Sequence, residues 1–283
     1  MASVALLGVK GGPAIRPGSS MPTSHLLRLG GRTVLVDAGL GASQGVIRQG
    51  AGLHGLDLIV ITHLHSDHYL ELGPLLLTAW TAGLKRPMRV IGPAGLKAYF
   101  EGFWASMSFD IELRIADEGR PDIREMVELQ ELREGAVLDA DGLRLRAMRN
   151  VHPPIADSFA LRFEGEGKAV VFSGDTAPMA EMAAFAKGAD LLVHEAMLLD
   201  GVDALCARVG NGDHRMKTHM LRSHTPAGEA GRIATQAGVG ALALNHLIPN
   251  DDPDFTEAHW REAVAPHWSG PLHIGRDGMV IEF

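Results

Sequence analysis

Four metal-ligand side chains lie within six consecutive positions of this sequence. They are His63, His65, Asp67 and His68, and they follow directly after the apolar run of residues 57–61. A run of this length with β-branched residues predicts a buried strand. Imidazole and carboxylate groups are common ligands of divalent metal ions. The segment therefore predicts a metal site where a strand passes into a loop.

The spacing within this cluster favours two metal ions rather than one. His63 and His65 are two positions apart, so on an extended backbone their side chains point to the same side. The turn that follows brings Asp67 and His68 round to a second point nearby. We therefore expect the two pairs to bind separate ions.

Three further ligand-type residues come at the ends of apolar strands. They are His152, Asp175 and His246, after the runs 143–148, 169–172 and 240–244. Gly174 lets the backbone approach closely beside Asp175. Strand ends on one side of a layered sheet share a common edge, so we expect these residues to converge on the first cluster.

The complete ligand set holds five imidazoles and two carboxylates. Because Cys206 is the sole cysteine, a structural zinc site built on several thiolates is excluded. The set suits two divalent cations, most economically zinc, although manganese and iron also accept it. We expect one ion to take His63, His65 and His152. We expect the other to take Asp67, His68 and His246, with Asp175 bridging the two.

Asp37 closes another apolar strand, and two interpretations of it stay open. It is either a surface residue or a carboxylate that orients one of the metal ligands.

The elements that must position these residues alternate between strands and helices. Residues 24–29 and 33–37 predict a hairpin, and helices are predicted over 74–82, 94–104, 178–187 and 226–237. From residue 127 the apolar pattern has a period of two, which indicates a mostly antiparallel sheet. No linker is visible, so residues 1–283 are predicted to form a single α/β domain, with two packed sheets and helices outside.

Composition narrows the class of protein. The 283 residues carry a net charge of -8, which argues against a protein whose affinity rests on nucleic-acid phosphate. The N-terminal apolar run is too short for export or for spanning a bilayer, and no basic residue precedes it. We therefore expect a cytoplasmic protein without membrane contact, and a homodimer is consistent with the sequence.

The motif His63-x-His65-x-Asp67-His68, followed by a lone His, a Ser-Gly-Asp and a final His after a strand, resembles the signature of the metallo-β-lactamase fold superfamily. The resemblance runs from Leu6 to the end of the chain. It implies a four-layer αββα sandwich with a dinuclear metal site along one edge.

Two further motifs resemble one branch of that superfamily. Residues 193–196 (Val-His-Glu-Ala) and 223–226 (Ser-His-Thr-Pro) are similar to motifs of the ribonuclease Z branch, which also contains arylsulfatase-like and phosphodiesterase-like enzymes. The resemblance implies that His224 is the general acid for the leaving group, with Glu195 as its electrostatic partner. Asp67 would orient the nucleophile while it binds its ion.

Other segments depart from that branch. The Gly-rich and basic arm with which ribonuclease Z enzymes grip tRNA is not found between residues 92 and 141, where aromatic and acidic residues stand instead. The aromatic residues 99–109 form either core or a lid over the metals. Basic residues in 210–222 either hold an anionic group of the substrate or form a solvated loop.

These observations lead to three hypotheses about function. The first is a hydrolase in which a hydroxide activated by two metal ions cleaves a sulfate ester, phosphodiester, carboxylic ester or lactone in a small molecule with an anionic or aromatic part. In this reading nucleic acid is not a partner. The second is a tRNA 3′-processing endonuclease, and the third is a non-catalytic metal-binding module.

Overall fold

The computed structural model describes residues 2–283, whose strands form two seven-stranded sheets. In spatial order the strands of the first sheet are β14 (Met279–Glu282), β1 (Ser3–Gly8), β2 (Ser24–Leu29), β3 (Arg32–Ala38), β4 (Leu58–Val60), β5 (Met88–Gly92) and β6 (Val127–Glu131). Strands β3 to β6 run parallel, whereas β1 pairs antiparallel with both β2 and β14. The first and last strands are therefore neighbours.

The second sheet repeats this division into a parallel and an antiparallel half. In spatial order its strands are β13 (Leu272–Ile274), β12 (Ala241–Ile248), β11 (Leu191–Met197), β10 (Lys168–Phe172), β9 (Phe159–Gly165), β8 (Leu143–Arg149) and β7 (Gly135–Ala140). Strands β10 to β13 are parallel and β7 to β10 antiparallel. Parallel strands place their carboxyl ends at one edge, where loops can meet.

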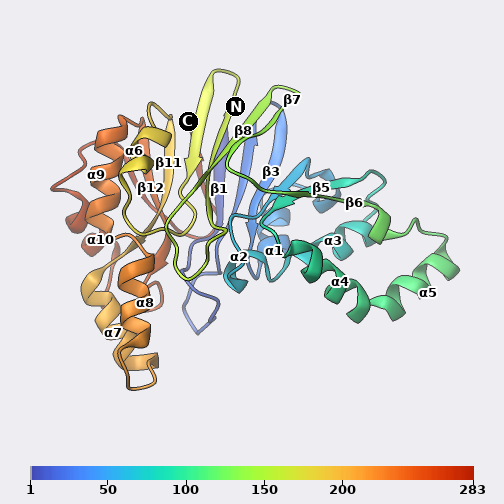
Figure 1. Ribbon diagram of the computed structural model, residues 1–283, viewed down its shortest axis with the longest axis horizontal. Helices are drawn as coiled ribbons and strands as arrows, with labels where there is room; N and C mark the ends of the chain where they lie inside the picture. Colours follow the sequence, from blue (N-terminus) through green and yellow to red (C-terminus); the bar gives the residue numbers. More distant parts are fainter. Residues whose placement is uncertain (1) are drawn as a thin grey trace.

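The two sheets pack face to face and helices cover their outer faces (Figure 1). Inward-pointing residues of both sheets, such as Val36 and Phe163, form one apolar core. The outer face of the first sheet is covered by α1 (Ala42–Arg48) and α3 (Leu72–Thr81), and α4 (Leu96–Ser106) and α5 (Ser108–Glu118) add a few buried residues to the same apolar layer. The outer face of the second is covered by α6 (Ala180–Phe185), α9 (Ala227–Ala237) and α10 (Glu257–Val264). The predicted αββα sandwich is confirmed.

One strand assignment from the sequence is wrong. Strand β6 (Val127–Glu131) was predicted to begin the antiparallel sheet, but it pairs parallel with β5 at the edge of the first sheet. The second sheet begins with β7. An alternating pattern reports a half-buried strand but says nothing about its partner, which explains the error.

Two pairs of helices project from the sandwich at opposite sides (Figure 1). On one side, α4 and α5 carry the aromatic segment 99–109, where Phe100 packs in the core and Phe109 is 82% exposed. On the other, α7 (Leu199–Val209) and α8 (Arg215–Ser223) form a hairpin. No helix within residues 2–283 has the length and apolar character needed to cross a membrane.

Candidate metal centre

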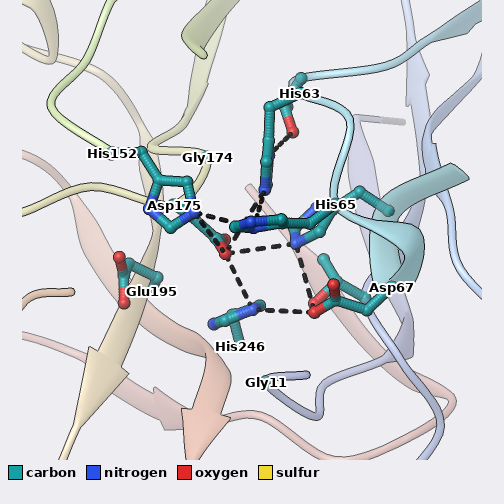
Figure 2. Close-up of polar contacts among 12 residues, drawn as sticks. Gly11, His63, His65, Asp67, His152, Gly174, Asp175, Glu195 and His246 are labelled. Atoms are coloured by element: carbon teal, nitrogen blue, oxygen red, sulfur yellow. Dashed lines mark hydrogen bonds and ion pairs between the residues drawn. The ribbon is translucent and has the colours of Figure 1, made fainter. Parts of the chain in front are cut away.

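All seven predicted ligands meet at one edge of the sandwich. Figure 2 labels six of them: His63, His65, Asp67, His152, Asp175 and His246. The loop after β4 and the short helix α2 (Ser66–Tyr69) carry the first four, and the loops after β8 and β10 carry His152 and Asp175. His246 comes from β12. Six of the seven side chains are buried, and His65 is partly exposed.

Three imidazoles form the first half of the cluster. His65 Nδ1 lies 3.2 Å from His63 Nε2 and 2.9 Å from His152 Nε2. Asp175 Oδ2 is 3.7 Å from His63 Nε2 and 3.9 Å from His152 Nε2. One donor atom from each of these four residues lies within 4.8 Å of the others, which is close enough for one ion to bind all four.

Asp67, His68 and His246 form the second half. Asp67 Oδ2 is 3.6 Å from His68 Nε2 and 3.3 Å from His246 Nε2. Asp175 Oδ2 lies 3.3 Å from His68 Nε2 and 3.0 Å from His246 Nε2. Because the same Asp175 oxygen also faces the first half, it stands between the two groups, and its role as a bridging ligand stays a prediction.

A bulge in β12 aims His246 into the site. The pairing of β11 with β12 runs Glu195 to Asn245 and then Ala196 to Leu247, so His246 is the extra residue, with a φ of 45°. A bulged residue leaves the ladder and re-aims its side chain. The prediction that His246 follows the strand is therefore corrected. The strand continues to Ile248, and the bulge turns the His246 side chain towards the other ligand-type residues.

The loop between β1 and β2 closes over the second half. The Gly12 amide donates a hydrogen bond of 2.8 Å to Asp67 Oδ2. A Cβ on Gly11 would lie 2.9 Å from His246 Cε1 and 2.5 Å from Ile248 Cγ1, so this position requires glycine. The buried Lys10 ammonium donates to the carbonyls of Gly11 and Gly12 and holds this turn.

Neighbouring groups orient several of the imidazoles. His68 Nδ1 donates to Asp37 Oδ2 at 2.7 Å, and Asp37 also accepts from the Thr62 amide and hydroxyl. His152 Nδ1 donates to the Ser223 carbonyl at 3.0 Å. Such contacts fix which ring nitrogen faces a metal ion. Asp37, 1% exposed, is thus the orienting carboxylate of the two alternatives and not a surface residue.

The first half of the cluster favours neutral imidazoles. Burial, followed by the neighbouring His68, lowers the pKa of His63 well below its ordinary value. Burial lowers the pKa of His152 to about 4. Neutral imidazole is the form that ligates metals.

The second half is strongly negative. Burial acts against a charge on His246, but Asp175 and Asp67 outweigh it and raise its pKa to about 10. Burial likewise opposes a charge on His68, yet Asp175 and Asp37 lead the carboxylates that raise its pKa well above the ordinary value. The carboxylates of the second half therefore favour a positive charge between them.

Divalent cations fit this donor set. The buried Nε2 of His68 has no hydrogen-bond partner among residues 2–283, although its Nδ1 is fixed by Asp37. With Nδ1 donating to Asp37, an unprotonated Nε2 would direct its lone pair towards the two carboxylates Asp67 and Asp175, as a metal ligand requires. The His and Asp cluster is consistent with a dinuclear metal site, and the identity of the metal stays a prediction.

His224 and Glu195 form a buried pair at the border of the cluster. His224 Nδ1 lies 3.1 Å and 3.0 Å from the two carboxylate oxygens of Glu195. The other side of the imidazole faces the cluster, where its ring stacks on that of His246 with centroids 5.3 Å apart. The Thr176 amide also donates to Glu195. The predicted pair is therefore present as a contact, 4% and 2% exposed.

A pocket of about 220 Å³ opens onto the cluster. Its walls come from the Gly11–Pro13 turn, from the residues around His65 and from α8, which supplies His219 and Met220. Segment 99–109 contributes no lining residue here, whereas segment 210–222 does. The role of Lys10 was missed from the sequence, although a lysine directly before Gly11-Gly12 in an apolar stretch is a usable signal.

The family model described as "Beta-lactamase superfamily domain" matches residues 32–247. This chain belongs to the beta-lactamase superfamily. One of its relatives is a Ribonuclease Z of Mycobacterium bovis (strain BCG / Pasteur 1173P2). The two sequences are 34% identical over 285 residues, which cover 100% of this chain and 98% of that relative.

Solved structures of the superfamily share its fold. The metallo-beta-lactamase fold protein YhfI from Bacillus subtilis matches with a TM-score of 0.71 and 21% identity, covering 99% of this chain and 98% of that one. The short form of human tRNase Z matches with a TM-score of 0.68 and 21% identity over the same shares.

These findings confirm the predicted superfamily and show that the chain is a metal-dependent hydrolase. The non-catalytic alternative is thereby set aside. The hypothesis of a small-molecule ester hydrolase, with nucleic acid excluded as a partner, is wrong: the relatives that match from end to end are named Ribonuclease Z. The error came from the missing basic arm between residues 92 and 141 and from the net charge of -8, because neither reports the local charge beside the site.

Proposed function

We propose that this protein is a ribonuclease Z-type endonuclease that cleaves a phosphodiester bond near the 3′ end of precursor tRNA. The observation that carries the proposal is the 34% identity to a Ribonuclease Z over the whole of this chain. The geometry supports it, since four of the ligand-type side chains (His65, Asp67, Asp175 and His246) and His224 of the buried His–Glu pair line a pocket open to solvent.

Two divalent cations are the cofactors of the proposed reaction, and zinc suits the imidazole-rich donor set best. His63, His65 and His152 would hold one ion, Asp67, His68 and His246 the other, and Asp175 both. When bound, such ions lower the pKa of water and stabilise the negative charge that develops on the phosphoryl oxygens.

The protein's own residues position the water and the leaving group. Asp67 Oδ2 is held by the Gly12 amide, so its carboxylate keeps a fixed orientation and would direct the attacking water. The water oxygen forms the new bond to phosphorus as the bond to the departing oxygen breaks, and the proton that the water loses passes to solvent in the open pocket. His224, held at Nδ1 by Glu195, delivers a proton from its other nitrogen to that departing oxygen.

Cleavage of a defined RNA tests this function. The metal-loaded protein is incubated with a precursor tRNA that carries a 3′ trailer, and the products are resolved on a sequencing gel. We expect one cut close to the 3′ end of the acceptor stem. His63→Ala should lose at least a hundredfold of this activity together with bound metal measured by elemental analysis.

Two RNA controls make the result specific. An unstructured RNA of equal length and the mature tRNA should both be cut far more slowly. A metal-loaded protein that leaves every precursor tRNA intact, or cuts the unstructured RNA equally well, would refute the proposal.

A further inference from the structure

Helix α8 forms one wall of the entrance to the metal centre. It ends at Ser223, directly before His224, and its residues His219 and Met220 line the pocket. The His219 ring lies 6.2 Å from that of His65 and 6.0 Å from that of His224, measured between centroids. A substrate that reaches the cluster therefore passes along this helix, which projects from the sandwich with α7 (Figure 1).

One face of α8 is occupied by contacts inside the protein. Met220 packs against an apolar cluster that includes Val202 of α7 and Ile248. Lys217 forms an ion pair of 2.5 Å with Asp203 of α7. These contacts fix how the helix is rotated about its axis.

The opposite face is basic and open. At about 100° per residue, four side chains of α8 fall within an arc of about 100°. They are Arg215, Thr218, His219 and Arg222, named here the α8 basic face. All are exposed except His219, which is partly buried where it meets the pocket.

One of the two arginines of the α8 basic face has no partner among the described side chains, and the other pairs only with an exposed carboxylate. Arg222 forms no hydrogen bond or ion pair with any side chain in the described chain, and Arg215 pairs with the nearby exposed Asp213. By contrast, Arg16 and Arg208 both bind Asp251. An unpaired guanidinium beside a hydrolytic site is available for phosphate, which it binds through two parallel hydrogen bonds.

The opposite projection has the reverse character. Helix α5 carries Asp110, Glu112, Asp117 and Glu118 against the single cation Arg114. A polyanion is repelled from that side of a protein whose net charge is -8 and is drawn towards the α8 basic face. The distribution of charge thus selects one side for approach.

We propose that the α8 basic face binds the phosphate backbone of the tRNA precursor and guides its 3′ end into the site. This inference rests on the proposed function. Arg215 and Arg222 are seven residues apart, about 10 Å along the helix, a length over which a duplex backbone carries several negative charges. The stripe is too long for one small anion and suits an extended polyanion.

The test measures the binding of catalytically competent protein to precursor tRNA at several salt concentrations. In the double variant Arg215→Gln/Arg222→Gln, we expect about tenfold weaker binding and a KM raised by a similar factor. The slope of log K against log salt should become shallower by about 1 to 2, because each lost phosphate contact contributes close to 1. Arg215→Lys/Arg222→Lys should restore most of the slope.

A charge-matched control removes two other exposed arginines. Arg232→Gln/Arg261→Gln, on α9 and α10, changes the net charge equally and should keep the wild-type KM and slope. An α8 variant that behaves as wild type, or a control that loses as much, overturns this inference and leaves the proposed function intact. Wild-type protein that neither binds nor cleaves precursor tRNA overturns both.

Discussion

His224 is tied to the metal centre by its neighbours rather than by its place in the sequence. Glu195 holds Nδ1 from one side and the ring of His246 stacks on the other, so the imidazole has little freedom to turn. One of its nitrogens also lies within 4.8 Å of ligand atoms of Asp175 and His246. His224 is therefore placed for proton transfer and lies close enough to the cluster to bind metal.

Replacing His224 by Ala distinguishes these two roles. A general acid contributes about 100- to 10,000-fold in rate, so we expect kcat for precursor tRNA to fall within that range. Bound metal, measured by elemental analysis, should stay at the wild-type level. His54→Ala, at an exposed position away from the site, is the control and should change neither quantity. Loss of metal in the His224 variant would assign it to the ligands instead.

Asp37 offers a second prediction at this scale. Asp37→Asn weakens the charged hydrogen bond to His68 Nδ1, so the ring is less firmly oriented and less basic. Loss of such a partner lowers metal affinity by about 10- to 100-fold. Competition with a chelator measures the change, and Asp117→Asn on exposed α5 is the matched control. Equal affinity in both variants would contradict the orienting role of Asp37.

At the scale of elements, the glycine-rich loop after β1 acts as a cover of the metal centre. Its turn is so close to His246 that a single methyl group at Gly11 cannot be accommodated without a shift. The loop also supplies the amide that holds Asp67. Backbone approach, and not a functional side chain, is what this loop contributes.

Gly11→Ala tests that contribution. The added Cβ would lie 2.9 Å from His246 Cε1, so we expect His246 to move. Activity should then drop by at least tenfold, because a misplacement of about 1 Å at the site can lower the rate by up to about 100-fold. Far-ultraviolet circular dichroism should show an unchanged fold. Gly102→Ala, in α4 with open space around it, should keep full activity and gain a little stability. Full activity in both variants would show that the loop moves to accommodate the methyl group without displacing His246.

At the scale of the whole molecule, stability depends on buried histidines outside the metal centre. His194 on β11 is fully buried, and its only described polar contact is with the Glu195 carbonyl. Burial lowers its pKa to about 4 from 6.5. In the unfolded chain the same group binds a proton below about pH 6.5.

The buried His194 should make the protein less stable in acid. Between about pH 6.5 and 4 the unfolded state takes up a proton that the folded state does not, so the free energy of unfolding falls as the pH falls. The contribution of His194 should amount to about 3 kcal/mol across this window. Urea unfolding at pH 7 and pH 4 measures it: His194→Gln should lose less stability than wild type. An equal loss in both proteins would rule out this histidine as a source of acid sensitivity.

Much of the fold was predictable from local patterns. Hairpin 24–29 with 33–37, helix α9 and strand β8 appear close to their predicted bounds, because turn residues and apolar periodicity act over a few positions. Helices α7 and α8 were not predicted, since their mixed composition resembles a solvated loop. The partner of β6 was assigned wrongly because pairing depends on distant segments.

The sequence by itself determined the superfamily and the seven ligand-type residues, because each lies in a short motif next to a strand whose chemistry is local. Only the tertiary structure decided how His246 is aimed, that Asp37 orients His68, and that α8 rather than segment 99–109 borders the pocket. These features depend on contacts between segments far apart in the chain, such as Gly11 with His246. A spacing rule that works within one element carries no information about such contacts.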